Sequence, residues 1–389
     1  MIWKVLNMKY QKLFDTVERL YPEYLKVWET ICNMESPTGD KERIDKVGNF
    51  FLEIGKKHGW ETEVFEDETG NVVCLTMNPT AQKEMITLSA HMDTVHPVGS
   101  FGYPPVTMDE KKIYGPGVID CKGGLAVTLL TMDALEKVGF VDRPIRFLLQ
   151  SNEELGSGAN TKKTIEYICQ KAQGSRAFFN LEGAGGNVVC VQRKGILTYT
   201  IKITGIAAHS SVCAKQGANA VAEAAHKIIE LEKFKDDAGI TCACCVVHGG
   251  IGHNTLAEYC EFMANFRFAT EEQRKYIVEY MHKLEERVYV PGCKTVLEER
   301  GCRPAMELVE RNVELAERMN EIFEENGFSK LTLISKAGGS DAAQVTMAGI
   351  PCVDNLGCCG GGAHSVHEFA VKESLKEYAK RLSLVICEL

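Results

Sequence analysis

Residues 91–124 read HMDTVHPVGSFGYPPVTMDEKKIYGPGVIDCKGG, and they place a histidine, two aspartates and several glycines between two apolar segments. His91 and Asp93 follow the short apolar run MITLSA, which predicts a β-strand that ends at the histidine. Residues i and i+2 of a strand point the same way, so Asp93 is expected beside His91. A carboxylate next to a histidine fixes the tautomer that a metal-bound imidazole needs. The stretch therefore predicts half of a metal site.

A plainer interpretation of the same stretch stays open. Asp93 and Asp120 can be turn residues or helix caps, and His91 can be an ordinary half-buried histidine. Asp120 is followed by Lys122, two glycines and the helix-like run LAVTLLTMDALEKVGF. The choice between the two interpretations depends on the rest of the chain.

The composition narrows the class of protein. A chain of 389 residues is too long for one ordinary core, so two domains are expected. With 45% hydrophobic residues, 25% charged residues and a net charge of −9, it reads as a soluble protein that does not bind nucleic acid. We find no apolar run of membrane-spanning length and no cleavage site of a signal peptide, so no membrane partner and a cytoplasmic location are expected.

The 16 cysteines are expected to be reduced thiols used as small apolar residues, because no extracellular feature accompanies them. Cys242 and Cys245 form a CxxC pattern within TCACCVVHGG, which reads as a strand. Positions three apart in a strand face opposite sides, which argues against a metal or redox pair.

Strands and helices alternate between residues 85 and 183. The order strand, helix, strand, helix, strand predicts an α/β fold with parallel strands and helices on both faces of the sheet. Ligands of such sheets gather at the carboxyl ends of the strands. His91, Glu153 and Glu182 are all expected at such ends.

The pattern changes after Gly195. The order β, α, β, β, α, β follows, which is compact and self-contained, so we expect an inserted domain at residues 194–303. Residues 1–193 and 304–389 are then expected to form one discontinuous catalytic, metal-binding domain, with the last part of the chain rejoining the first sheet.

Three carboxylates follow the next two predicted strands. Glu153 and Glu154 are adjacent in SNEELGSG, where like charges repel unless a cation or proton intervenes. One can then bind a metal while the other accepts a proton from a metal-bound water. Glu182 ends the next strand in FFNLEG. A solvated acidic loop and a surface acid are the plainer alternatives.

The last candidate ligands lie behind three consecutive glycines, in GGGAHSVHE. Glycine tolerates positive φ and lets the backbone approach a ligand, so His364 can be presented at a pocket wall. His367 and Glu368 are expected to be able to face solvent. The order of all these groups favours two zinc ions that share a carboxylate and a water.

These motifs resemble those of the M20 metallopeptidases, the co-catalytic zinc group that includes glutamate carboxypeptidase, acetylornithine deacetylase and peptidase T. The segments HMDTV, YGPGVIDCKGG, NEELGSG, AAHSSV with GANAV, and GGSDAA with GGGAHSVHE match in the family's order and span nearly the whole chain. The resemblance implies a zinc-exopeptidase-like domain with a mixed sheet flanked by helices. It also implies an inserted α+β lid or dimerisation domain, and hence a homodimer.

The resemblance also implies a role for each matching residue. Asp93 would orient His91, Asp120 would bridge two zinc ions, and Glu153 would be the general base. The metal ligands would be His91, Asp120, Glu154, Glu182 and His364. The position of Glu182 is aspartate in glutamate carboxypeptidase and peptidase T but glutamate in the deacylase branch. The sequence near GGSDAA, by contrast, is more similar to that of glutamate carboxypeptidase. Cobalt or manganese can also occupy such ligands.

Four further residues match substrate-site positions of the family. His209 in GIAAHSS corresponds to a histidine that stabilises the oxyanion from the inserted domain. Asn254 and Arg267 match positions that hold the terminal carboxylate of the substrate, and Gly339 in GGSDAA is also assigned to substrate binding. As alternatives, His209 can face solvent and Arg267 can be a structural ion-pair partner.

We therefore expect a di-zinc hydrolase that cleaves an amide bond next to a free carboxylate in a small peptide, as a carboxypeptidase or a di- or tripeptidase. The attacking water would lie between the metals, and Glu153 would be the base. A second hypothesis is an N-acyl amino acid deacylase that uses the same site. A third is a catalytically silent metal-binding protein.

Overall fold

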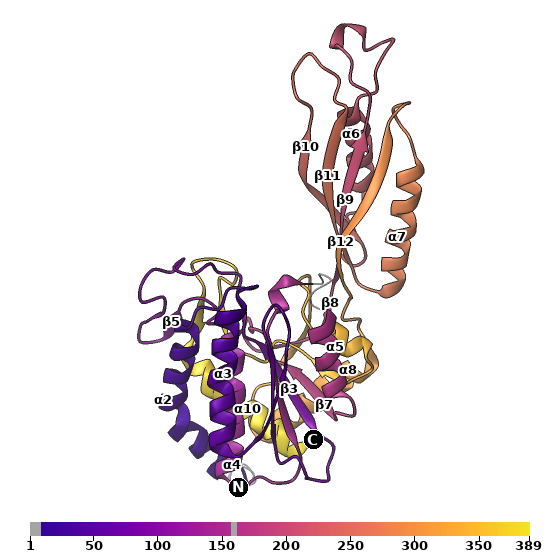
Figure 1. Cartoon of the computed structure of the whole chain (residues 1–389). Helices are drawn as coiled ribbons and strands as arrows, with labels where there is room; N and C mark the ends of the chain where they lie inside the picture. Colours follow the sequence, from indigo (N-terminus) through magenta and orange to yellow (C-terminus); the bar gives the residue numbers. More distant parts are fainter. Residues whose placement is uncertain (1–8, 157–161) are drawn as a thin grey trace.

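The computed structural model describes residues 9–156 and 162–389 of the chain. Figure 1 shows a large lobe that carries both ends of the described chain and a smaller, elongated lobe that stands away from it. Two segments far apart in sequence build the large lobe, and the segment between them builds the smaller one. In the described part of the chain we find no helix that is both long and apolar enough to cross a membrane.

The large lobe is organised around a six-stranded mixed sheet. Its strand order is β1-β2-β6-β3-β7-β14, in which β3, β6, β7 and β14 run parallel while β1 and β2 form an antiparallel hairpin that pairs with β6. The mixed sheet expected for this fold class is thus confirmed. The strands are β1 (Glu61–Phe65), β2 (Val72–Met77), β3 (Ile86–His91), β6 (Ile145–Gln150), β7 (Ala177–Asn180) and β14 (Cys352–Val353).

Helices cover both faces of this sheet. On one face α4 contacts β3 and packs between α2 and α10, while α3 lies against the β1–β2 hairpin; α5 and α9 cover the other face. Successive residues of β6 alternate between the two cores, as Phe147 and Leu149 enter one and Leu148 the other. The helices are α2 (Gln11–Asn33), α3 (Lys41–His58), α4 (Lys122–Lys137), α5 (Lys162–Ala172), α8 (Glu310–Glu325), α9 (Ala342–Met347) and α10 (Lys372–Glu388).

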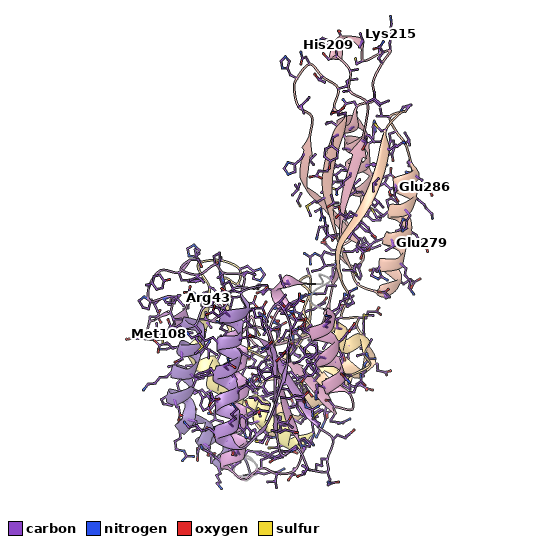
Figure 2. The ribbon with its side chains drawn as sticks, viewed as in Figure 1. Arg43, Met108, His209, Lys215, Glu279 and Glu286 are labelled. Carbon is purple, nitrogen blue, oxygen red and sulfur yellow. The ribbon has the colours of Figure 1, made fainter. Side chains whose placement is uncertain are left out.

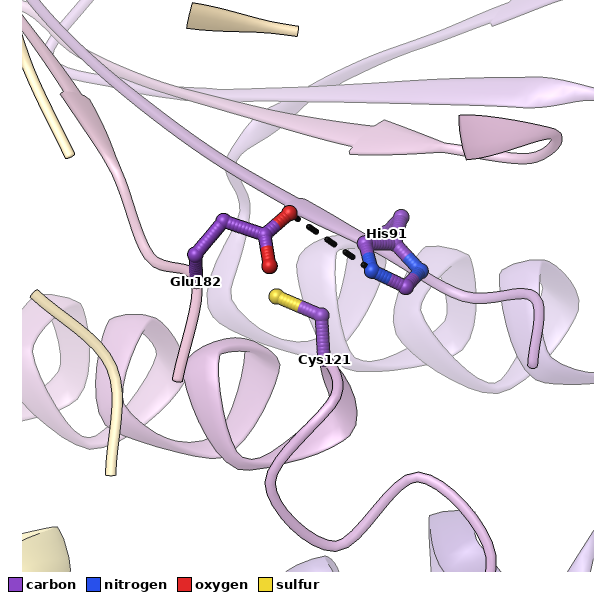
Figure 3. Close-up of side chains that lie close together, drawn as sticks. All are labelled: His91, Cys121 and Glu182. Carbon is purple, nitrogen blue, oxygen red and sulfur yellow. Dashed lines mark ion pairs between the residues drawn. The ribbon is translucent and has the colours of Figure 1, made fainter. Parts of the chain in front are cut away.

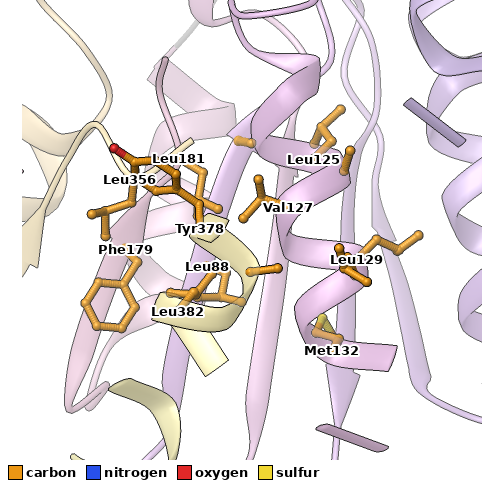
Figure 4. Close-up of a cluster of buried hydrophobic side chains, with 14 of the residues drawn as sticks. Leu88, Leu125, Val127, Leu129, Met132, Phe179, Leu181, Leu356, Tyr378 and Leu382 are labelled. Carbon is orange, nitrogen blue, oxygen red and sulfur yellow. The ribbon is translucent and has the colours of Figure 1, made fainter. Parts of the chain in front are cut away.

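The core around α4 holds the helix tightly against the sheet. Figure 4 shows Leu125, Val127 and Leu129 of this helix among Leu88 and Phe179 of the strands. Gly124 permits the contact, because a Cβ atom there would lie 2.1 Å from the carbonyl oxygen of Leu181. The start of α4, directly after Asp120, is thereby fixed close to the end of β7.

The smaller lobe has the element order β, α, β, β, α, β between residues 195 and 303, and we refer to it as the inserted domain. Its sheet has the order β10-β11-β9-β12, with every neighbour antiparallel, and its buried side chains form a cluster separate from that of the large lobe. Its elements are β9 (Gly195–Thr204), α6 (Ala220–Leu231), β10 (Thr241–Gly249), β11 (Tyr259–Phe268), α7 (Glu271–Glu286) and β12 (Lys294–Arg303).

Cys242 is buried and Cys245 is exposed, as expected for opposite sides of a strand, and all 16 cysteines are free thiols.

Two small sheets were not expected from the sequence. One has the order β15-β16-β5-β4, which joins the loop before Asp120 to the C-terminal glycine segment, and the other pairs β13 with β8. Their strands are β4 (Thr107–Met108), β5 (Lys112–Tyr114), β8 (Val188–Arg193), β13 (Thr332–Lys336), β15 (Gly360–Gly361) and β16 (Phe369–Val371). The first of these sheets brings the segments of Asp120 and His364 together.

Candidate metal centre

The predicted ligands lie at one edge of the large sheet. His91 is the last residue of β3, the Glu153–Glu154 pair lies in a 3-10 turn (η1, Glu153–Leu155) directly after β6, and Glu182 follows β7. The carboxyl ends of parallel strands meet at the same edge, which explains this convergence. Asp120 precedes α4, and His364 lies between β15 and β16 with a positive φ of 61°.

Asp120 stands between the two histidines and uses a different oxygen for each. Its Oδ1 atom lies 3.1 Å from Nε2 of His91, and its Oδ2 atom lies 3.2 Å from Nε2 of His364. Each oxygen of this one carboxylate therefore faces a different imidazole. The carboxylate of Asp120 thus contacts both histidines at once.

Each histidine has a second carboxylate partner. Oε1 of Glu182 lies 3.7 Å from Nε2 of His91, and Oε2 of Glu154 lies 3.3 Å from Nε2 of His364. The other carboxylate oxygen of Glu154 is buried and has no hydrogen-bond partner among the described residues. A buried carboxylate oxygen left without a donor is costly, so this atom fits a site that a cation fills.

The chemistry of the donors fits divalent metal ions. Two imidazoles and three carboxylates in this spacing match the nitrogen and oxygen ligands of zinc, cobalt or manganese. The groups His91, Asp120, Glu154 and His91, Cys121, Glu182 each place their ligand atoms within 4.8 Å of one another. The candidate metal-binding residues from the two ends of the chain therefore converge.

Cys121 is a neighbour of the centre that the sequence reasoning missed. Figure 3 shows its sulfur atom close to Glu182 and His91. The thiol donates to the carbonyl oxygen of Leu181 at 3.1 Å and is buried. Sequence reasoning treated the cysteines as small apolar residues, and only the adjacency of Cys121 to Asp120 signalled its position.

The crowded charges change the acidity of the ligands. Burial, followed by the negative charge of Asp120, raises the pKa of Glu154 to about 7 and that of Glu182 well above its usual value. Hydrogen bonds to Asp120 and Glu154 raise the pKa of His364 to about 10. Burial opposes ionisation of Asp120, but its hydrogen bonds to His364 and His91 hold its pKa below the usual range. The raised pKa values of Glu154, Glu182 and His364 thus favour their protonated forms.

Asp93 connects His91 with the glutamate pair. Nδ1 of His91 lies 2.9 Å from the backbone oxygen of Asp93 and 3.4 Å from its Oδ1 atom, which leaves Nε2 to face Asp120. The carboxylate of Asp93 also accepts the backbone N–H groups of Glu153 and Glu154, each at 3.1 Å. Asp93 is fully buried, and through these contacts it orients both the histidine and the turn that follows β6.

Glu153 has a partner that the sequence did not predict. The guanidinium of Arg303, the last residue of β12, donates to the carboxylate of Glu153 and to its backbone oxygen. The two side chains are only 5% and 9% exposed. The strand that leaves the inserted domain is thereby connected to the carboxylate beside the metal ligands.

A cavity of about 520 Å³ opens onto the centre. Arg267 and Lys336 line it, and neither side chain forms an ion pair with any residue that the structure describes. Gly339 also lines the cavity, and a Cβ atom there would lie 2.6 Å from a side-chain carbon of Arg303. The cavity therefore has an acidic side at the metal ligands and cationic groups elsewhere on its wall.

His209 and Asn254 lie apart from the cavity. Both are exposed at the far end of the inserted domain, where the backbone oxygen of Asn254 accepts from Ser210, and Figure 2 shows His209 at this tip. Nδ1 of His209 lies 2.8 Å from the hydroxyl oxygen of Ser211. The structure thus brings Arg267 and Gly339 to the cavity that the metal ligands line, but not His209 or Asn254.

The expectation that Glu368 can face solvent is wrong, because its side chain is buried. His367 is exposed, as expected. Glu368 is fully buried behind the centre and accepts the backbone N–H groups of Ile119 and Asp120 at 2.9 and 3.1 Å. Its position after three glycines suggested an exposed loop, but the pairing of β16 with β5 turns the side chain inward. The short apolar run of Phe369, Ala370 and Val371 that follows is the sequence signal that could have indicated this.

Comparisons with known proteins agree with this geometry. The model of peptidase family M20/M25/M40 matches residues 87–388. Carboxypeptidase G2 of Pseudomonas sp. (strain RS-16) is 28% identical over 366 residues, which cover 91% of this chain and 86% of that protein. Among solved structures, a tripeptidase from Staphylococcus aureus has a TM-score of 0.80 at 22% identity, covering 94% of this chain and 97% of the other.

A further solved structure is a dinuclear metal-binding peptidase of the M20 family from Bacillus subtilis. It has a TM-score of 0.69 at 16% identity and covers 96% of this chain and 99% of its own. The family match spans most of the chain and includes all five predicted metal ligands. The chain belongs to peptidase family M20/M25/M40 and is an M20-type metallo-exopeptidase or amidohydrolase.

Proposed function

We propose that the protein is a two-metal hydrolase that cleaves an amide bond next to a free carboxylate in small peptides. The observation that carries this proposal is the carboxylate of Asp120, whose two oxygens face His91 and His364 at 3.1 and 3.2 Å. His91, Asp120 and Glu182 would hold one ion, and His364, Asp120 and Glu154 the other. Zinc suits these donors, as do cobalt and manganese.

Bound ions would polarise the scissile carbonyl and would lower the pKa of a bound water toward about 7. Glu153 would take the proton of the attacking water and later give it to the leaving amine, a contribution of about 10² to 10⁴-fold. Asp93 supports this role because it accepts the backbone N–H of Glu153 at 3.1 Å. Arg303 donates to the Oε1 atom of Glu153, so the Oε2 atom would take the proton.

The cationic groups of the cavity support an anionic substrate. Arg267 and Lys336 would attract the free carboxylate of a peptide, and a guanidinium can pair with both of its oxygens. Gly339 lines the same cavity, which supports its predicted role in substrate binding, and its lack of a side chain lets Arg303 pack against it. Carboxypeptidase G2 and the tripeptidase, which resemble this chain, favour small peptides as the substrate class.

We infer that the working form is a homodimer formed through the inserted domain, residues 194–303, with residues 1–193 and 304–389 as the catalytic unit. His209 is exposed at the tip of the inserted domain, so it would reach the centre of the partner subunit and stabilise the developing oxyanion there. Asn254, whose backbone oxygen accepts from Ser210, would hold the substrate carboxylate from the same tip. The free thiols favour a cytoplasmic location.

An N-acyl amino acid deacylase is the second candidate. Glu182, which lies 3.7 Å from His91, is a glutamate as in the deacylase branch that the sequence resembles. This activity would use the same ligands, the same base and the same carboxylate-binding groups. A panel of dipeptides, tripeptides and N-acyl amino acids separates the two candidates by their rates.

The test of the proposed function is Glu153→Gln, with the exposed Glu110→Gln as the control. We expect Glu153→Gln to keep the metal content of the parent and to lose about 10² to 10⁴-fold in hydrolysis over this panel. Glu110→Gln should match the parent in both measurements. Parental turnover by Glu153→Gln would contradict the assignment of the base.

A further inference from the structure

Glu368 is a fully buried carboxylate directly behind the candidate metal centre. It accepts the backbone N–H groups of Gly117 at 3.2 Å, Ile119 at 2.9 Å and Asp120 at 3.1 Å, and one of its oxygens lies 2.7 Å from Nε2 of His96. A carboxylate without water is costly to bury unless donors surround it. Three backbone donors from residues 117–120, with His96 as a further partner, show that this segment is built around the carboxylate.

Glu368 contacts the backbone of Asp120, the residue whose side chain faces both His91 and His364. Two of its N–H donors, Ile119 and Asp120, share the oxygen Oε1, so this atom fixes the backbone that carries the bridging carboxylate. Charge-assisted hydrogen bonds of this kind are about twice as strong as neutral ones. A shift of Asp120 would change its distance to both histidines at once.

Glu368 also holds the segment of the second histidine. His364 lies four positions before it, and the backbone N–H of Glu368 donates to Ser365 at 3.1 Å within this turn. The next residue, Phe369, pairs with Tyr114 of β5. One side chain thus connects the turn of His364 to the segment of Asp120, although almost 250 residues separate them.

We propose that Glu368 is a positioning residue that sets the spacing between Asp120 and His364 and thereby the affinity for both metal ions. The inference rests on the proposed two-metal function. Groups that hold metal ligands in place typically contribute about 10- to 100-fold in metal affinity. Glu368 touches neither the substrate cavity nor the ligand atoms of the histidines, so it acts through the backbone of Asp120.

The inserted domain offers a matched control in Glu223. This glutamate is also fully buried and accepts two backbone N–H groups, from Tyr289 at 2.8 Å and Val290 at 2.6 Å. It lies in α6, outside the lobe that carries the metal ligands. Glu223 also pairs with the buried Lys227 at 3.3 Å, as Glu368 pairs with His96 at 2.7 Å. Its variants therefore report what the loss of a buried, paired carboxylate does without a connection to the metals.

The experiment compares Glu368→Gln and Glu368→Ala with Glu223→Gln and Glu223→Ala. Zinc affinity is measured by chelator competition, and the melting temperature is measured on the metal-free proteins. We expect Glu368→Ala to lose about 10- to 100-fold in zinc affinity. Glu368→Gln should lose less, because its amide oxygen still accepts from Ile119 and Asp120. Both alanine variants should melt below the parent, and the Glu223 variants should keep the affinity of the parent.

Cobalt loading gives a second measurement, because the visible spectrum of bound cobalt reports the ligand geometry. Glu368→Ala should change this spectrum, whereas Glu223→Ala should not. Parental affinity and spectrum in Glu368→Ala, or an equal loss in Glu223→Ala, would overturn the inference. A parent protein that binds no divalent ion would instead contradict the proposed function on which the inference rests.

Discussion

The guanidinium of Arg303 donates to both the side chain and the backbone oxygen of Glu153, across the junction of the two lobes. Arg303 ends β12 of the inserted domain, and Glu153 begins the turn after β6. Because both side chains are buried, each depends on the other for charge compensation. The position of the inserted domain and the charge compensation of the Glu153 carboxylate, the proposed base, therefore depend on the same contact.

We predict that Arg303→Met lowers the unfolding free energy of the metal-free protein by about 3–5 kcal/mol, because it leaves the carboxylate of Glu153 buried and unpaired. Adding Glu153→Gln should recover part of this loss, with a coupling energy of about 0.5–3 kcal/mol. Denaturant titration of the two single variants and the double variant measures it. The exposed pair Lys202 and Glu298, with side chains 40% exposed each, is the control and should couple by less than about 1 kcal/mol. Strict additivity of Arg303→Met and Glu153→Gln would show that the contact carries no net energy.

Arg267→Met and Lys336→Met should each weaken the binding of substrates with a free carboxylate. A hydrogen bond to a charged group is worth about 1.5–3 kcal/mol, which corresponds to a rise in KM of about 10- to 100-fold with kcat little changed. Amidated substrates should show no such rise. Arg300→Met is the matched control, because Arg300 lies on β12 and pairs with Glu298 at 3.1 Å instead of lining the cavity. An equal rise in KM for free and amidated substrates would exclude a role in carboxylate binding.

Metal affinity should increase as the pH rises from 6 to 8. Without ions, Glu154 has a pKa of about 7 and His364 a pKa of about 10, so both carry protons at low pH that a metal must displace. Raising the pH through 7 removes the proton of Glu154 and leaves one fewer to displace. Chelator competition at pH 6, 7 and 8 measures this change. An affinity that is constant or falls over this range would contradict the proton assignment.

Two slow variants should regain activity when mixed, if His209 serves the partner subunit. His209→Ala lacks the proposed oxyanion donor, and Glu153→Gln lacks the base, so a mixed dimer contains one site with both groups intact. We expect each variant alone to be slow, and the mixture to regain activity after subunit exchange. Exchange is followed by the fluorescence of labelled subunits. Complete exchange without regained activity would place His209 at the centre of its own chain or outside catalysis.

The ends of the strands could be predicted because local sequence determines them. The run MITLSA before His91 gives β3, and the run IRFLLQ gives β6, so the ligand-bearing turns follow directly. Asp93 stands beside His91 as the period of a strand requires. The alternation of strands and helices likewise predicted the parallel strands β3, β6 and β7, whereas the mixed sheet was expected only from the family resemblance.

Long-range packing explains what the sequence left open. The partners of Glu368 and Arg303 lie almost 250 and 150 positions away, so no local pattern indicates them. The strands β4, β14 and β15 are two residues long, too short for a recognisable period. His209 lies at the distant tip because of the way the inserted domain joins the large lobe. The periods of strands and helices do not predict how two lobes are joined.

The most direct test of the two-metal centre is the metal content and activity of Asp120→Asn beside the parent. We predict about two divalent ions per parent chain, as expected for a bridging carboxylate. Asp120→Asn should lose both ions at low metal concentration together with its hydrolytic activity, whereas parent protein stripped by a chelator should recover on addition of zinc. Retention of both ions and parental activity by Asp120→Asn, or hydrolysis by the metal-free parent, would contradict the account.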